Sequence, residues 1–405
     1  MLHRTCNPQT GFAASQGTAY YGCGRVVSLG SFDSSCAIVS FPNEKDQVKC
    51  WGGYGPLVGS TGYTGDAMSE MGAGRPTVSL GTHRFVLTVS VGMYHACVVL
   101  DNRKVKCWGK NKFAALGYGD TRDRGMHQNQ MGDSLPYVDL GTGFDAVSVC
   151  AVGKASDVAH SCALSERGEI KCWGKGYTLW RQEPFVNRLE DFGQTPAEMG
   201  DNLRTINNVT KDHVLQMSCG THGICGILDD GTVSCQDQLG SFRATGMSNA
   251  IGLGNSEAVQ ISVGDFVCAL FRQGSVVCQS RGNPYEIMQL GTGRFATQIS
   301  VGNMHACAML ENESVKCWGT NWIGELGYGD TKARGSGEAN TMGDNLPELD
   351  FPSGLFPVAI YTGSVSCVLL NDNRLRCWGW GIYGRLGHGM YYPPFTDDDA
   401  WFEMG

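Results

Sequence analysis

The 405-residue sequence has few charged residues, no basic excess and no long apolar run. Charged residues make up 17% of it, and 31 Lys and Arg face 39 Asp and Glu, so the formal net charge is −8. A protein that tracks phosphates is expected to be basic, so this charge argues against nucleic acid as a partner. No apolar run approaches the ~20 residues of a transmembrane helix. Residues 1–30 also lack an apolar segment of the signal-peptide type.

Glycine and cysteine, by contrast, are abundant, with 57 and 18 residues. A glycine-rich, lightly charged chain is typical of many short strands joined by tight turns rather than of helices. Eighteen regularly spaced cysteines favour an oxidising compartment. The N-terminus lacks the matching export signal, a conflict that a segment upstream of residue 1 would resolve.

The cysteines mark an internal repeat. The second cysteine of each pair anchors one of seven repeats, at Cys50, Cys107, Cys172, Cys235, Cys278, Cys317 and Cys377. Five anchors begin Cys-Trp-Gly, whereas Gln follows Cys235 and Cys278. Six anchors have a partner ten residues upstream, at Cys97, Cys162, Cys225, Cys268, Cys307 and Cys367. In the first repeat, Cys36 pairs with Cys50 across a longer turn.

Three pieces of the fuller repeats, Gly-x-x-His-x-Cys, Val-x-Cys-Trp-Gly and Gly-x-Leu-Gly-x-Gly, resemble the RCC1 (regulator of chromosome condensation) repeat family. The cysteine-bearing version is similar to a variant found in bacterial and algal extracellular or surface proteins. The resemblance covers residues 24–390 and implies an all-β, seven-bladed β-propeller. It implies little about function, because propellers carry out many unrelated tasks.

The phase of the repeat predicts a closed ring. The chain ends on Met-Gly, a pair that precedes the outer strands of the full repeats, and it begins just before an inner strand. We expect residues 1–23 to close or extend the ring, with N-terminal residues completing the strands of the last repeat. Residues 391–405 are interpreted as an acidic tail or closing strand. Closure by both ends would avoid exposed sheet edges.

The hairpin spacing places the paired cysteines opposite each other. A turn centred on Asn312 sets Cys307 opposite Cys317, and opposed Cβ atoms lie ~4.5–5.5 Å apart, close enough for a disulfide after adjustment. The same arithmetic applies to the other pairs separated by ten residues. We interpret all fourteen repeat cysteines as structural disulfides, each contributing roughly 3 kcal/mol. Buried free thiols are the alternative.

Four cysteines fall outside these pairs, at Cys6, Cys23, Cys150 and Cys219. Cys150 and Cys219 occupy nearly equivalent points of consecutive repeats, where a bridge between blades is one interpretation. Two cysteines per repeat without a third ligand make no zinc site. We predict neither a metal nor a cofactor.

The repeat tryptophans are expected to fill the space between blades. They stand at Trp51, Trp108, Trp173, Trp318 and Trp378. Light absorption is the alternative, because plant UV-B receptors share the fold, but no Gly-Trp-Arg-His-Thr stretch occurs here. His95, His160 and His305 share another repeat position, which predicts either hydrogen bonds to a neighbouring blade's backbone or a metal-binding ring.

A cation precedes the second cysteine in five repeats. These residues are Lys49, Lys106, Lys171, Lys316 and Arg376. An incomplete ring of cations predicts contact with an anion or an acidic partner. The alternative is that the side chains lie across adjacent apolar surface. In the Gly-Tyr-Gly-Asp-Thr loops, Asp120 and Asp330 predict Asx-turns, with calcium binding as the alternative.

No nucleophile–base–acid set recurs at catalytic spacing. The sequence therefore favours a monomeric, non-enzymatic scaffold that binds a protein partner outside the cell or at its surface. Recognition is expected where the repeats diverge, at residues 176–201 and 236–254. The family resemblance supplies an alternative, a cytoplasmic or nuclear guanine-nucleotide exchange factor for a small GTPase. A metal-dependent hydrolase built on the histidine position is a third hypothesis.

Overall fold

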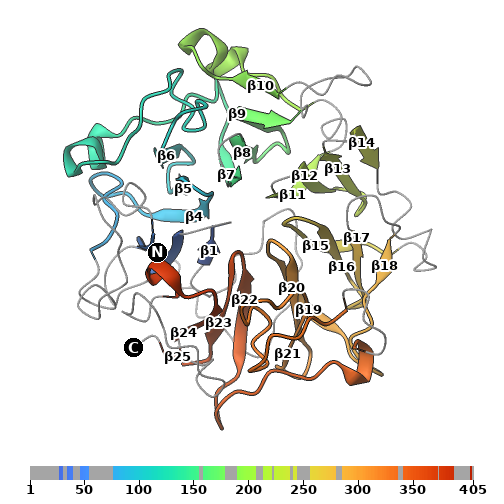
Figure 1. Ribbon diagram of the computed structural model, residues 1–405. Helices are drawn as coiled ribbons and strands as arrows, with labels where there is room; N and C mark the ends of the chain where they lie inside the picture. Colours follow the sequence, from blue (N-terminus) through green and yellow to red (C-terminus); the bar gives the residue numbers. More distant parts are fainter. Residues whose placement is uncertain are drawn as a thin grey trace, which may run out of the picture.

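The computed structural model describes residues 27–30, 34–39, 46–53, 76–154, 158–177, 189–206, 213–220, 223–237, 240–243, 256–279, 285–335, 341–372, 374–386 and 402–403. They form seven antiparallel sheets that follow one another around a central axis (Figure 1). The described residues include no helix long and apolar enough to cross a membrane. The predicted all-β, seven-bladed propeller is confirmed.

Each sheet is built from consecutive strands. The first contains β1 (Val27–Leu29), β2 (Ser34–Val39) and β3 (Gln47–Gly52). The second contains β4 (Val86–Val91), β5 (His95–Leu100) and β6 (Val105–Gly109). The third contains β7 (Ala146–Lys154), β8 (Val158–Ser165), β9 (Ile170–Tyr177) and β10 (Leu189–Phe192). The fourth contains β11 (Val214–Gly220), β12 (Gly223–Leu228), β13 (Val233–Asp237) and β14 (Gly240–Arg243).

The remaining sheets follow the same plan. The fifth contains β15 (Ala258–Val263), β16 (Val267–Phe271), β17 (Val276–Gln279) and β18 (Glu286–Ile287). The sixth contains β19 (Ala296–Val301), β20 (His305–Leu310) and β21 (Val315–Gly319). The seventh contains β22 (Pro357–Thr362), β23 (Val365–Leu370), β24 (Leu375–Gly379) and β25 (Phe402–Glu403). Short 3-10 helices lie between sheets, namely η4 (Gln128–Gln130), η5 (Gly132–Ser134), η6 (Pro196–Glu198), η7 (Gly200–Asn202), η8 (Gly343–Asn345) and η9 (Ile382–Gly384).

The hydrophobic core consists of layers between neighbouring sheets. One layer joins Cys307 and Val315 of the sixth sheet to Ile360 and Val368 of the seventh. The middle strands are apolar on both faces, so that every residue of β5 is buried. An equivalent layer joins Val365 of the last sheet to Ala37 of the first. A sheet packed on both sides explains why the strands lack polar–apolar alternation.

The first strand of each sheet lines the axis, and serine side chains join these strands. The Ser90 hydroxyl, for example, accepts a hydrogen bond from the N–H of Ala151 in the next sheet at 2.9 Å. The same bond links Val91 to Ser28, Val263 to Ser218, Val301 to Ser262 and Thr362 to Ser300. An edge strand has N–H groups that no strand in its own sheet can pair, and these serines satisfy them.

Glutamine side chains make a second bridge between the inner strands. The Gln298 amide accepts from the N–H of Ile360 at 2.9 Å and donates to its carbonyl at 3.2 Å. Gln260 makes the same two hydrogen bonds with Ile299. The side-chain amide therefore acts as one residue of a missing neighbouring strand.

Identical backbone contacts close the ring. The N–H of Asn303 donates to the carbonyl of Gly363, and the N–H of Ser364 donates to the carbonyl of Gly30 in the first sheet. A Cβ on Gly302 would lie 2.5 Å from the Gly363 carbonyl oxygen, so glycine is required for this approach. The first and seventh sheets thus meet as two consecutive sheets do.

The seventh sheet obtains its outer strand from the C-terminal segment, where β25 pairs with β24. Its four strands all come from residues 357–403, so the predicted contribution of N-terminal residues to this sheet is not seen in the described part of the chain. The predicted N-terminal segment, 1–23, and most of the predicted tail, 391–405, lie outside the described residues.

Replacing Gln298 by Ala should destabilise the ring, because the N–H and carbonyl of Ile360 lose their partners. We expect a loss of about 1–3 kcal/mol in the free energy of unfolding, measured by urea denaturation with disulfides intact. The exposed Asn345→Ala serves as control and should change stability by less than about 0.5 kcal/mol. Equal effects of the two substitutions would contradict this role for Gln298.

Candidate binding surface

The second and sixth sheets each carry a loop after their third strand, β6 or β21, and the two loops share one frame of hydrogen bonds. In the second, the buried Asn111 amide donates to the Asp120 carbonyl at 2.7 Å and accepts from the N–H of Leu116 at 2.9 Å. Asn321 repeats both bonds with Asp330 and Leu326 at the same distances. A buried amide that satisfies backbone groups at both ends of a loop fixes its path.

An ion pair and a tyrosine complete the frame. Arg124 forms a bidentate pair with Asp120, both bonds at 2.9 Å, and its guanidinium lies 4.2 Å from the Tyr118 ring centre. The Tyr118 hydroxyl accepts from the N–H of Cys107 and donates to its carbonyl, in place of a fourth strand. Asp120 also accepts from the N–H of Arg122 as in an Asx-turn, which supports the turn interpretation over calcium.

The tip of this loop carries different residues in the two sheets. In the sixth, Trp322 is 70% exposed, and the nearby Met304 is 46% exposed. The loop is tied to Met304, whose carbonyl accepts from the N–H of Thr320 at 3.0 Å. We call the side of the ring that carries these loops the loop face.

In the second sheet, the corresponding tip is aromatic and basic. The ammonium groups of Lys112 and Lys175 lie 5.0 Å and 4.8 Å from the Phe113 ring centre. Lys175 belongs to β9, so this cluster crosses from the second sheet to the third. Lys110 lies 5.1 Å from the ring centre of Tyr94. The constant frame therefore presents variable aromatic, apolar and basic side chains on the loop face.

The opposite side of the ring carries the turns between the two cysteine-bearing strands of each sheet. We call it the hairpin face. Phe295 is 52% exposed there, and it directly precedes β19, at the other end from Met304. A six-residue strand spans about 20 Å. Phe295 therefore marks a second exposed apolar position, well separated from Trp322.

The predicted ring of cations is wrong for three of its lysines. The Lys316 ammonium is buried and donates to the carbonyls of Leu290 at 2.7 Å and Gly343 at 3.0 Å. Lys106 and Lys171 make the equivalent pair of bonds. Burial lowers the pKa of each. They hold the outer segments of their own repeats, which are the stretches before the first strand and after the cysteine-bearing hairpin of a sheet. They do not present a charge to an anion. Arg376 is also buried, and Lys49 is half-buried.

An aspartate of the Met-Gly-Asp motif supports the same outer segment, a role that the sequence did not indicate. The Asp201 carboxylate accepts from the N–H and hydroxyl of Thr142. Asp133 and Asp344 bind Thr82 and Thr292 in the same way. These bonds hold the pKa of all three carboxylates below the ordinary value.

The repeat histidines lie inside the seams between sheets. His305 Nε2 is 2.7 Å from the hydroxyl of Ser366 in the seventh sheet, which itself donates to the Glu325 carbonyl. His95 and Ser161 form the same contact at 2.8 Å. Each ring thus contacts a neighbouring blade's serine hydroxyl, a partner that the sequence did not indicate. His160 is also buried, and neither ring nitrogen has a hydrogen-bond partner in the described part of the chain.

The repeat tryptophans also fill the seams. The indole N–H of Trp378 donates to the carbonyl of Glu325, in the loop of the preceding sheet, at 2.9 Å. Trp173 donates to Ala115, and Trp51 of the first sheet donates to Arg385 of the last. The tryptophan bonds therefore cross the closing seam as well.

Disulfides join the seven hairpin pairs, with Cα atoms 3.9–4.1 Å apart. They link Cys36–Cys50, Cys97–Cys107, Cys162–Cys172, Cys225–Cys235, Cys268–Cys278, Cys307–Cys317 and Cys367–Cys377. An eighth joins Cys150 to Cys219 between the third and fourth sheets. Cys6, Cys23 and much of the predicted recognition segments 176–201 and 236–254 lie outside the described residues.

Comparison with known proteins agrees with this repeat geometry. A family model described as Regulator of chromosome condensation (RCC1) repeat matches residues 86–114, which run from β4 into the loop at Asn111. The Arabidopsis thaliana ultraviolet-B receptor UVR8 is 35% identical over 316 residues, 76% of this chain and 56% of UVR8. This chain is an RCC1-like repeat protein.

Other relatives of the RCC1-like chain are more distant. The Danio rerio RCC2 homolog is 22% identical over 75% of this chain and 54% of its own length. The Mus musculus E3 ubiquitin-protein ligase HERC2 is 25% identical over 68% of this chain and 6% of its own length. The chain therefore spans about half of UVR8 and of the RCC2 homolog, and a small part of HERC2.

Solved structures share the RCC1-like fold at low identity. Yeast RCC1 (Prp20), in a crystal structure with Kap60, gives a TM-score of 0.60 at 13% identity, covering all of this chain and 91% of that one. Human WBSCR16 gives 0.57 at 16% identity, covering 80% and 84%. At these identities the likeness concerns the fold.

Acidification should destabilise the protein through its seam histidines. Burial lowers the pKa of His305 to about 4, whereas an unfolded histidine titrates near 6.5. Between these values the unfolded chain binds more protons, so stability falls as the pH falls from about 6.5 to 4, by about 1.4 kcal/mol per pH unit for each such histidine. His305→Gln should reduce this slope in urea denaturation at graded pH. His127→Gln, at an exposed position, is the control variant. A slope in His305→Gln as steep as in the wild type would contradict the prediction.

Proposed function

We propose that this RCC1-like propeller is a non-enzymatic scaffold that binds a protein partner through its loop face, as a monomer in an oxidising environment outside the cell or at its surface. The observation that carries the proposal is the contrast within the loop after the Cys-Trp-Gly strands. Its frame is the same at Asn111 and Asn321, whereas its tip changes from Lys112 to Trp322.

The energetics of binding favour such an arrangement. A loop held by a buried amide and a bidentate ion pair loses little conformational entropy when it binds. Tryptophan is enriched among the residues that dominate protein–protein interfaces. Trp322 exposes most of its surface, and its loop is bonded through Thr320 to the exposed Met304. Burial of both under a partner would contribute a large hydrophobic term.

The use of the recurring polar residues supports a non-enzymatic role. Lysine and aspartate hold outer segments, and serine and glutamine join the inner strands. His95 and His305 lie enclosed in seams, so neither is open to a substrate. The crystal structure of yeast RCC1 with Kap60 provides an example of this fold in a protein–protein complex. Eight disulfides support an oxidising environment, because thiols are kept reduced in the cytosol.

The loop-face assignment can be tested by capture of partners on immobilised protein. The double variant Trp322→Ser, Met304→Ser should lose partners from the extracellular fraction of the source organism, quantified by mass spectrometry. With one purified partner we expect Kd to rise at least about 30-fold, as for interface residues worth 2 kcal/mol or more. Phe295→Ser, on the hairpin face, is the matched control and should retain binding. Loss with Phe295→Ser and retention with the double variant would instead place recognition on the hairpin face.

The oxidising environment makes a separate prediction about natively purified protein. Within the described residues, eight disulfides contain sixteen of the chain's eighteen cysteines, and the other two, Cys6 and Cys23, lie outside these residues. Thiol titration under denaturing, non-reducing conditions, after rapid alkylation at harvest, should therefore detect at most two thiols per chain. Eighteen free thiols would refute the oxidising environment while leaving the binding role open.

A further inference from the structure

The seam between the third and fourth sheets differs from its neighbours at one position. At five other seams, a serine hydroxyl accepts from the N–H of a residue in the next inner strand, as Ser218 does from Val263. In the third sheet, Cys150 replaces that serine, and in the fourth, Cys219 replaces the residue that would donate. The two cysteines form a disulfide with Cα atoms 6.1 Å apart. A covalent bond therefore stands where the other seams have a hydrogen bond.

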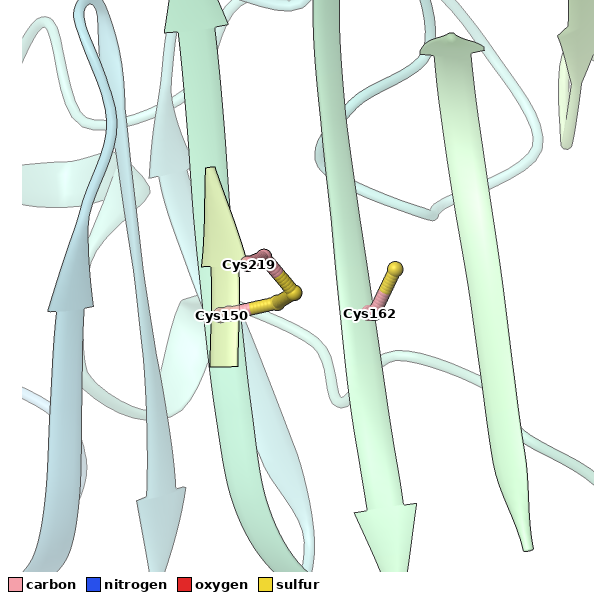
Figure 2. A group of neighbouring side chains, drawn as sticks. All are labelled: Cys150, Cys162 and Cys219. Carbon is pink, nitrogen blue, oxygen red and sulfur yellow. A yellow bond between two sulfur atoms is a disulfide. The ribbon is translucent and has the colours of Figure 1, made fainter. Parts of the chain in front are cut away.

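A second disulfide lies beside this one. Cys150 on β7 is directly opposite Cys162 on β8, and Cys162 is bonded to Cys172. The Sγ atoms of Cys150, Cys162 and Cys219 all lie within 4.8 Å of one another (Figure 2). Thiol–disulfide exchange needs a thiolate near the sulfur of another disulfide. A thiolate released at Cys150 would already have Cys162 as its neighbour.

The seam disulfide is also more accessible than those of the hairpins. The hairpin cysteines are buried, whereas Cys219 is half-buried. Cys219 lines a cavity of about 100 Å³ on the propeller axis, together with Gly220 and Gly264. A small molecule that enters along the axis meets Cys219 before any hairpin disulfide.

We propose that Cys150–Cys219 is a thiol-exchange site, at which a low-molecular-weight thiol modifies Cys219. The thiolate attacks Cys219 Sγ, forms a mixed disulfide and releases Cys150 as a thiolate. Cys150 then attacks Cys162 Sγ, which breaks the Cys162–Cys172 bond and forms Cys150–Cys162. The proton lost by the small thiol ends on Cys172. Two S–S bonds, one between Cys219 and the small thiol and one between Cys150 and Cys162, thus replace the original two. One thiol is consumed and one is released at Cys172, so no electrons are gained or lost, and the covalent link between the two sheets is opened.

The test uses the folded, full-length chain and reduced glutathione as the probe. After a short exposure the protein is quenched with N-ethylmaleimide, and its peptides are mapped without reduction. We expect glutathione on Cys219, maleimide on Cys172 and a Cys150–Cys162 linked peptide before any other hairpin disulfide opens. Opening of another hairpin first, or an unmodified Cys219, would overturn the proposal.

A matched variant separates exchange at this site from general reduction. Cys150→Ser with Cys219→Val recreates the serine–valine pair of the neighbouring Ser218–Val263 seam, so the ring should remain folded, as checked by near-UV circular dichroism. Maleimide labelling of Cys172 should fall at least tenfold in this variant. Unchanged labelling would show that the Cys162–Cys172 bond opens without the seam disulfide, against the proposal.

A second variant tests the transfer step. With Cys162→Val and Cys172→Val, the mixed disulfide on Cys219 should still form, and maleimide should now label Cys150. If Cys150 is the labelled residue in the wild type as well, the transfer to Cys162 does not take place and the second step is refuted.

Discussion

The arrangement depends on one constraint, the unpaired N–H groups of the strand next to the axis. Each sheet ends there, and an edge strand with free donors would be unsatisfied or open to pairing with another chain. The protein meets the constraint with side chains from the preceding sheet. A serine accepts from one N–H, and in the fourth to sixth sheets a glutamine two residues earlier pairs with another residue. These bonds also set the height at which neighbouring sheets meet, so they determine which residues face each other in the layers between them.

Closure of the ring follows from the same contacts. The last sheet meets the first through the Ser364–Gly30 backbone bond and through the Trp51–Arg385 bond. Both reproduce contacts between consecutive sheets, so closure requires no special structure at that seam. Because the recurring polar residues are used inside the ring, the exposed side chains that differ between the second and sixth repeats are those at loop tips such as Trp322. This use of the recurring residues inside the ring therefore accounts both for the uniform loop frame and for the variable loop tips.

The sequence predicted contacts that follow from one turn or from a shared repeat position, and it missed hydrogen bonds whose partners are brought together only by the folded chain. The opposition of Cys307 and Cys317 depends on one turn, so counting residues was sufficient to find it. The role of Lys316 was misjudged because its two acceptors, at Leu290 and Gly343, are brought to it only by the fold of the whole repeat. The Gln-x-Ser spacing at 260–262 and 298–300 was a usable signal for the seam contacts. Its meaning, however, appears only when the next sheet is in place.

The shortened fourth and fifth repeats show which part of the repeat the ring requires. Both have lost the tryptophan after the second cysteine, yet Gln216 and Ser218, and Gln260 and Ser262, still join their inner strands to the next sheet. The hairpin disulfides Cys225–Cys235 and Cys268–Cys278 are retained as well. A closed ring therefore depends on the inner strands and the hairpin, whereas the outer part of a blade differs between repeats without opening the ring. A repeat of this kind can acquire new surface residues on its outer side while its contribution to closure is unchanged.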